Sequence, residues 1–244
     1  ASLGELFSTF GSQSVGVLDG FALTTAAYWR LLEEGGLREA LAALFASLHP
    51  EDMGQLEKAG RTARRLILET ALPSDVAYAA VHGYRALVKR LGHTPQLAVR
   101  SSASAEDLPE ASFAGAAESF LNVCGEEALL LAIHQCFASL FTDRAIDYRS
   151  RQGYPHLKVA LSIGVMPMVR SDKGCSGVMF TLDTESGFRD VVTLTGSYGL
   201  GEYVVKGVVT PDEWTIFKPT LKQFFQPLIG RTLGSKQQRL IYDE

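Results

Sequence analysis

The spacing of apolar residues changes near Pro155, and that change limits the fold classes open to this chain. Before this point, apolar residues recur three and four positions apart, which predicts amphipathic helices. After it, Val159, Leu161, Ile163 and Val165 alternate with small or polar residues, which predicts a strand. A helix-rich first part followed by a strand-rich second part is typical of an α+β fold.

The first part has the pattern of several packing helices. They are expected over residues 37–48, 53–67, 77–91 and 126–148. Pro50 ends the first of them, Ser74 is a suitable N-cap for the third, and Gly92 is a suitable stop for the third.

The second part has the pattern of short strands separated by glycine or acidic turns. These strands are expected over residues 176–181, 191–195, 204–209 and 213–217. Such spacing favours a mainly antiparallel sheet joined by hairpins. We therefore expect one composite domain with two lobes, residues 1–155 and 156–244.

Composition excludes several classes of function. A formal net charge of −4 gives no electrostatic reason to expect nucleic acid as a partner. No apolar run approaches the roughly 18 residues of a membrane helix, and no signal pattern opens the chain, so we expect a cytoplasmic protein without a membrane partner. The cysteines and histidines show no metal-ligand spacing, so no residue is assigned to a metal and reduced thiols are expected.

The run from Val99 to Pro109 carries the most informative chemistry. Arg100 is a permanently charged, forked donor that directly follows an apolar strand, and hydroxyl groups come next at Ser101 and Ser102. A phosphate chain could bind to such a group of donors. An ion pair of Arg100 with Glu106 or Asp107 in a serine-rich turn is the structural alternative.

Further segments decide between these readings. They are residues 111–123, 165–188, 199–202 and 210–213. Together with the run around Arg100, they closely resemble the ATP-binding part of the phosphoenolpyruvate synthase (pyruvate, water dikinase) family. The resemblance runs through almost the whole chain and implies an ATP-grasp-like arrangement, in which nucleotide is held between two α+β lobes.

The resemblance also implies a reaction and its participants. In this family ATP phosphorylates a histidine on a swivelling domain, the phosphate passes to pyruvate, water takes the other phosphate, and AMP is released. The implied cofactors are ATP and Mg²⁺. The implied partners are the swivelling phosphohistidine domain and the pyruvate-binding domain of a longer protein, while a homodimer is left open.

The family's phosphate-binding lysine would precede residue 1, and its late Glu and Gln-x-Arg segment, which binds Mg²⁺, would follow residue 244. We therefore expect a fragment that is inactive by itself.

By its resemblance to the family's phosphate-binding motif, Arg100 is expected to contact the terminal phosphates of ATP and to be catalytic. Ser101 and Ser102 are expected to shape the loop. Gly115 would offer its backbone N–H and Ser119 its hydroxyl. The family usually has Gln-Gln where this chain has Ala116 and Ala117, and Thr in place of Ser119, so two amide side chains are missing. A small-residue turn is the alternative for this loop.

Transfer of the nucleoside-binding residues gives a hinge and a carboxylate. Met166, Met168 and Val169 are expected to contact adenine, although Pro167 has no N–H to donate. An apolar edge strand ended by proline is the alternative. Glu202 is expected to contact the ribose hydroxyls, with a simple Gly-x-Gly turn as the alternative.

The segment Asp183 to Phe188 is distinctive of the family, but its role stays open because it would also make a good turn.

Two other functions are weighed against this one. The losses at Ala116, Ala117 and Met166 are compatible with a non-catalytic module that senses nucleotide or binds a partner. The ATP domain of a related dikinase, such as rifampin phosphotransferase, is an enzymatic alternative, but the run Asp-Thr-Glu-Ser-Gly-Phe argues against it.

Overall fold

The computed structural model describes residues 2–10, 16–46, 48, 52–103, 118–223 and 225–243. The chain divides into two compact units, residues 1–168 and 169–244. Both contain helix and an antiparallel sheet, so the expected α+β class is confirmed. No described helix is both long and apolar enough to cross a membrane.

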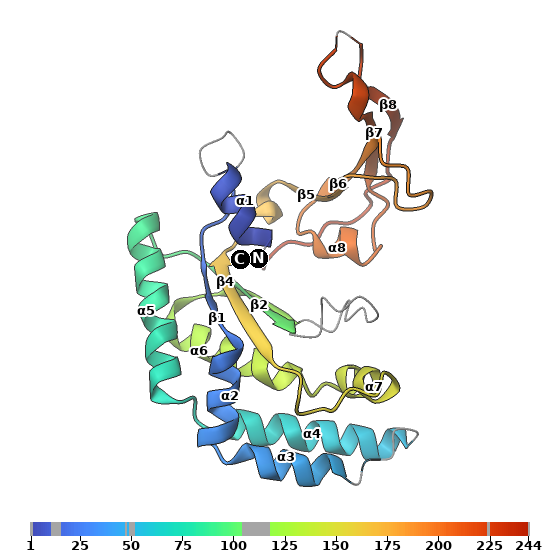
Figure 1. The fold of residues 1–244 in the computed structure, drawn as a ribbon. Helices are drawn as coiled ribbons and strands as arrows, with labels where there is room; N and C mark the ends of the chain where they lie inside the picture. The colour runs from blue at the N-terminus through green and yellow to red at the C-terminus, as the bar shows by residue number, and fades with distance from the viewer. Residues whose placement is uncertain are drawn as a thin grey trace. The chain divides into compact units, whose positions relative to one another are not determined.

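The first unit contains a four-stranded antiparallel sheet with the order β1-β4-β2-β3 (Figure 1). Its strands are β1 (Phe21–Leu23), β2 (Leu97–Ala103), β3 (Ser119–Val123) and β4 (Leu161–Pro167). β4 is the last of these four strands in the sequence, but in the sheet it lies between β1 and β2. It pairs with β2 along the whole length of both strands. β4 therefore belongs to the first unit, although the sequence pattern groups it with the later strands.

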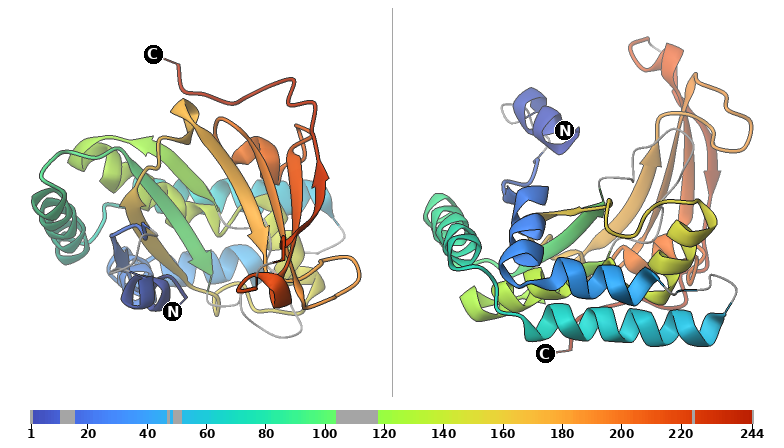
Figure 2. Two further views of the ribbon diagram at one scale, coloured as in Figure 1. Left: turned by 90° about the horizontal axis from the view of Figure 1, so that it is seen from above. Right: turned by 60° about the horizontal axis from the view of Figure 1, so that its bottom comes forward.

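Helices cover one face of this sheet. The helices of this unit are α1 (Ser2–Phe10), α2 (Thr25–Glu34), α3 (Leu37–Ala46), α4 (Met53–Glu69), α5 (Ser74–Leu91), α6 (Gly125–Ser139) and α7 (Asp143–Arg151). α2 and α6 contact the sheet, and α3 and α4 lie side by side in the layer beyond (Figure 2). Leu97, Val99, Ile163 and Val165 lie on the covered face and are buried in one core with the helices. The helical and strand periodicities thus meet in a single apolar layer.

The helix ends follow local chemistry. Asp52 caps α4 by accepting a hydrogen bond from the Gln55 N–H at 3.0 Å. Gly92 ends α5 in the left-handed conformation with φ of 74°, as predicted. The N-cap of α5 is Pro73, and Ser74 is the first helical residue, so the predicted cap is displaced by one position.

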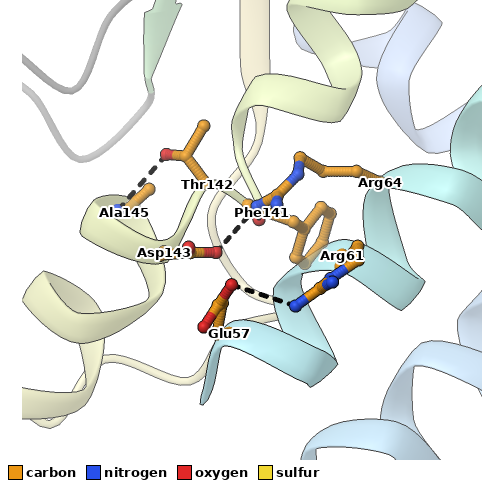
Figure 3. Close-up of polar contacts among 7 residues, drawn as sticks. All are labelled: Glu57, Arg61, Arg64, Phe141, Thr142, Asp143 and Ala145. Atoms are coloured by element: carbon orange, nitrogen blue, oxygen red, sulfur yellow. Dashed lines mark hydrogen bonds and ion pairs between the residues drawn. The ribbon is translucent and has the colours of Figure 1, made fainter. Parts of the chain in front are cut away.

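The predicted helix over 126–148 is wrong, because it is broken into α6 and α7. Thr142 begins α7 by accepting a hydrogen bond from the Ala145 N–H at 3.4 Å. Arg64 of α4 donates to the carbonyl oxygen of Phe141 at 2.6 Å and to Oδ1 of Asp143 at 2.9 Å (Figure 3). The break is stable because a side chain from another helix satisfies a carbonyl that the helix end leaves without an intrahelical partner.

The second unit contains a four-stranded antiparallel sheet whose strands follow chain order. They are β5 (Cys175–Phe180), β6 (Val191–Tyr198), β7 (Asp212–Phe217) and β8 (Leu228–Thr232), with the helix α8 (Glu202–Val205) and the 3-10 turns η1 (Ser171–Lys173) and η2 (Lys218–Thr220). The predicted strand at 204–209 is wrong. Glu202 and Lys206 form an ion pair four residues apart, which favours a helical turn, and Gly207 ends that turn at φ of 65°.

The compact units and the expected lobes divide the chain by different criteria, the first by packing and the second by nucleotide binding. Compactness places the division after Met168, because β4 pairs with β1 and β2. The lobes expected at 1–155 and 156–244 stay a prediction about which parts hold the nucleotide.

Candidate functional site

The face of the first sheet opposite the helices carries Arg100. Strand alternation directs Arg100 to this face, where it is exposed, while Val99 and Ser101 point to the core. Register places Arg100 beside Gly164 of β4 on one side and Ser119 of β3 on the other. The residues nearest to the only cation of this row are therefore small.

The same row continues to β1, where Ala22 pairs with Gly164. A second row, one step along the strands, contains Ala98 beside Met166. Small side chains leave the backbone of a sheet open to close approach by a ligand. The open face thus has a low floor around Arg100, and Met166 is the larger apolar group at its edge.

Arg100 forms no ion pair with any residue that the structure describes. The alternative partners from the sequence, Glu106 and Asp107, lie outside the described residues. A guanidinium offers five N–H donors in a planar fork, which suits the oxygens of a phosphate. The described surroundings of Arg100 therefore favour anion binding.

Ser101 has a structural role. Its hydroxyl accepts a hydrogen bond from the Glu118 N–H at 2.9 Å and donates one to the Glu118 carbonyl at 3.2 Å. The Ser101 N–H donates to the same carbonyl at 3.1 Å. These bonds hold the start of β3 against β2 and so set Ser119 beside Arg100.

Of the other residues predicted to contact phosphate, two lie on the same face as Arg100 and one lies outside the described residues. Ser102 and Ser119 are exposed on the face that carries Arg100, and the Ser162 hydroxyl donates to the Ser102 carbonyl at 3.3 Å. Gly115 falls within residues 104–117, outside the described part of the chain. The structure thus brings Arg100, Ser102 and Ser119 together, with Ser101 holding the strands from below.

The predicted adenine hinge follows β4. Met166 is half-buried on the open face, and Val169 is 59% exposed. The Met168 N–H donates to the Gln96 carbonyl at 2.7 Å, so this donor is used inside the protein and is not the one that a base edge would meet. Apolar contact is therefore the better-supported role for this segment.

Arg170 is a charged residue near the hinge that the sequence reasoning did not single out. It forms a bidentate ion pair with Asp172, in which Nε donates to Oδ1 at 2.8 Å and Nη2 donates to Oδ2 at 2.6 Å. Its guanidinium lies over the Tyr242 ring, 5.8 Å from the ring centroid. The Arg170 guanidinium holds the pKa of Asp172 below its usual range. The spacing Arg-x-Asp directly after the hinge is the sequence feature from which this ion pair could have been predicted.

Glu202 and Asp183 belong to the second unit. Glu202 is exposed at the start of α8, where its carboxylate pairs with Lys206. Asp183 accepts hydrogen bonds from the N–H groups of Glu185 and Ser186 at 2.8 and 2.9 Å, and these bonds lower its pKa. The Asp183 carboxylate thus forms a turn, which is the structural alternative that the sequence left open.

The described residues contain no group of three or more His, Cys, Asp or Glu side chains placed to hold a metal ion. The donors beside Arg100 are hydroxyls and a cation, whereas Mg²⁺ prefers carboxylate, phosphate and water oxygens. This set of side chains does not fit a protein-held Mg²⁺, so no step is assigned to one.

The whole chain, residues 1–244, matches the family described as "Pyruvate phosphate dikinase, AMP/ATP-binding domain". This chain is 49% identical to the phosphoenolpyruvate synthase of Synechocystis over the whole of its own 244 residues. It is 48% and 47% identical to the phosphoenolpyruvate synthases of Helicobacter pylori and Escherichia coli, over 99% of the chain in both cases. The chain spans about 30% of the length of each of these relatives.

Proposed function

Because the chain belongs to the family of pyruvate phosphate dikinase AMP/ATP-binding domains, we propose that the open face of its first sheet binds the phosphates of ATP. The observation that carries this proposal is Arg100, an exposed guanidinium on a floor of small residues with no ion pair among the described side chains. Anions bind where forked donors remain unpaired and the backbone is accessible.

Each residue of this face has a proposed role. Arg100 forms a bidentate contact with the terminal phosphates and neutralises their negative charge as the phosphoryl group leaves. The hydroxyls of Ser102 and Ser119 donate to phosphate oxygens, and the Gly115 N–H does the same from its loop. Ser101 acts indirectly, since its hydroxyl fixes the distance between β2 and β3.

The nucleoside would bind beyond the phosphates. Met166 and Met168 offer polarizable thioethers to the adenine face, and Val169 adds apolar surface. Glu202 is proposed to accept hydrogen bonds from the ribose hydroxyls, in exchange for its contact with Lys206. Mg²⁺ is proposed to arrive with the ATP phosphates, and its protein ligands are expected outside the described residues.

We further propose that the complete protein makes phosphoenolpyruvate from pyruvate, ATP and water and releases AMP and phosphate. The support is the similarity to phosphoenolpyruvate synthases, of which this chain spans about 30%. A histidine on a swivelling domain and a separate pyruvate-binding domain would complete the reaction. The three cysteines are free thiols, which is compatible with our proposal of a cytoplasmic enzyme.

ATP titration followed by NMR tests the phosphate site, because chemical shifts report even weak binding. We expect Arg100→Ala to weaken ATP binding by about 10-fold to 100-fold, the range for loss of a charge-assisted contact. Arg100→Lys should recover only part of the affinity, because a point charge does not replace the fork. The control is Arg61→Ala, which removes an exposed arginine of α4 paired with Glu57 (Figure 3). Equal affinities for the Arg100→Ala and Arg61→Ala variants would refute the assignment.

A further inference from the structure

Arg149 of α7 is a charged residue that lies wholly inside the first unit. Its side chain is fully buried, and its Nε donates to Nδ1 of His156 at 3.2 Å. The other two guanidinium nitrogens, Nη1 and Nη2, are also buried and have no hydrogen-bond partner in the described part of the chain. A buried polar group without a partner costs free energy, and a buried charge without one costs more. These two nitrogens therefore need a ligand that the described side chains do not supply.

The charge of Arg149 is not neutralised by any acidic side chain that the structure describes. Asp143 and Asp147 of the same helix both pair with other arginines. Burial lowers the pKa of Arg149 only to about 10, so the guanidinium stays charged at neutral pH. His156 is neutral there, because burial and then the charge of Arg149 lower its pKa to about 4. One positive charge is therefore left in this part of the core.

Tyr28 of α2 brings a second unsatisfied group to the same place. Its side chain is fully buried, and its hydroxyl has no hydrogen-bond partner within the described ranges. Tyr28 and Arg149 lie close enough for each to influence the pKa of the other. Burial raises the pKa of Tyr28, so the group remains a neutral hydroxyl that can donate a hydrogen bond and does not cancel the arginine charge.

Aromatic rings surround these donors. The Arg149 guanidinium lies over the Phe141 ring at 5.5 Å from its centroid, and Phe45 stacks on the other ring with centroids 5.5 Å apart. Tyr28 packs against Phe137 with centroids 5.7 Å apart. Ring edges carry partial positive charge, and apolar surroundings strengthen the attraction between a guanidinium and an anion. The cost of removing a multiply charged ion from water makes a small monovalent anion the suitable ligand.

We propose that Arg149 and Tyr28 bind a small monovalent anion of the halide class, such as chloride, inside the helical layer of the first unit. Nη1 and Nη2 form the end of the planar guanidinium, where two N–H bonds point the same way and can share one anion. The Tyr28 hydroxyl donates a third hydrogen bond. The anion cancels the buried charge and, because it binds only the folded chain, stabilises the first unit.

Urea unfolding of the 244-residue chain at neutral pH tests this site. Chloride is exchanged for gluconate at constant ionic strength, because gluconate is too large for a buried site. Circular dichroism follows the helices of the first unit. We expect the folding equilibrium constant to rise about threefold or more between roughly 1 mM and roughly 100 mM chloride, as for a ligand that binds only the native state.

Two variants assign the effect to the proposed ligands. Arg149→Met keeps most of the side-chain length without the charge and should abolish the chloride dependence. Tyr28→Phe removes only the hydroxyl and should weaken the dependence. The matched control is Tyr84→Phe, which removes a hydroxyl from another buried tyrosine of the same core and should leave the dependence intact.

A crystallographic measurement on the native chain keeps the proposal testable even where Arg149→Met fails to fold. Crystals are grown with bromide in place of chloride, and the anomalous signal of bromine is measured. We expect an anomalous peak within hydrogen-bonding distance of Nη1 and Nη2 of Arg149.

Three results would overturn the proposal. A folding constant that is insensitive to chloride, or that responds equally in the native chain and in the Arg149→Met and Tyr28→Phe variants, means that no specific anion binds here. Electron density at Arg149 without an anomalous signal assigns the place to water. A carboxylate from outside the described ranges at Nη1 or Nη2 means that the chain neutralises this arginine itself. None of these results depends on ATP binding by Arg100, which lies on the opposite face of the sheet.

Discussion

At the scale of single residues, Arg100 and Arg149 lie in opposite environments. Arg100 is exposed and unpaired among the described residues, whereas Arg149 of α7 is fully buried. Arg149 donates to Nδ1 of His156 at 3.2 Å and lies over the Phe141 ring at 5.5 Å. Its two terminal nitrogens have no hydrogen-bond partner among the described residues, and burial lowers its pKa to about 10. It therefore remains charged at neutral pH.

His156 should make the stability of the chain depend on pH. Burial, and then the charge of Arg149, lower the pKa of His156 to about 4 from a usual 6.5. The unfolded chain therefore takes up the proton first, so stability is complete above pH 6.5 and is lost as the pH falls toward 4. After allowance for solvent screening, we expect a loss of about 1–2 kcal/mol over this range.

Urea unfolding between pH 4 and 7 measures this loss. The comparison is with His156→Gln, which keeps a hydrogen-bond acceptor near Arg149 but does not titrate. His134 also has its pKa lowered by burial, so part of the slope will persist in the variant. An identical pH slope in both proteins would mean that His156 is not the group responsible.

At the scale of elements, contacts between distant segments override local preference. The residues between α6 and α7 are held by Arg64 of α4 (Figure 3). Gly60 of the same helix lies directly against them. A methyl group at Gly60 would come within 2.7 Å of Oδ1 of Asp143 and 3.0 Å of the Phe141 carbonyl. The break is therefore fitted to α4 and needs both its arginine and its glycine.

Removal of the Arg64 side chain should destabilise the first unit. Arg64→Ala leaves the Phe141 carbonyl and the Asp143 carboxylate without their donor, and we expect a loss of about 1–2 kcal/mol in the free energy of unfolding. Arg61→Ala, on the same helix, removes only an exposed pair with Glu57 and should cost about 0–0.5 kcal/mol. Chemical denaturation of both variants checks this difference, and equal losses would contradict it.

At the scale of the whole molecule, the two units differ in how much apolar surface they bury. The core of the first unit contains residues from all of its central strands and from α2 to α7, whereas the second unit buries few apolar side chains. Regions with few buried apolar contacts unfold at lower free energy than a packed core. The units should therefore differ in stability.

The two tryptophans can report the units separately, because Trp29 lies in α2 and Trp214 in β7. In urea, the fluorescence of Trp214 in a Trp29→Phe variant should change at a lower concentration than that of Trp29 in a Trp214→Phe variant. Circular dichroism on both variants controls for damage by the substitutions. Coincident transitions would show that the chain unfolds as one cooperative unit.

The 244-residue chain by itself should not make phosphoenolpyruvate. The proposed reaction needs a phosphohistidine domain and a pyruvate-binding domain, and the chain spans about 30% of its phosphoenolpyruvate synthase relatives. Incubation with ATP, Mg²⁺ and pyruvate, with AMP and phosphoenolpyruvate measured over time, tests this. The full-length Escherichia coli enzyme is the positive control, and sustained AMP formation by the chain would contradict the prediction.

The sequence by itself determined the family, the α+β class and the identity of the exposed cation. These follow from local information: helical and strand periodicities, a glycine after α5, and motifs whose residues are adjacent in the chain. The sequence predicted that this strand ends at Val99, whereas β2 continues to Ala103, and the structure therefore places Arg100 and Ser101 on opposite faces of the sheet.

Only the tertiary structure decided which strands are neighbours and where helices are interrupted. β4 joins the first sheet, and Arg64 stabilises the break before α7. Hydrogen bonds between distant segments control these features, and no short window of sequence contains both partners. The low floor of Ala22, Gly164 and Ser119 around Arg100 exists for the same reason, since three separate strands must pair in register to form it.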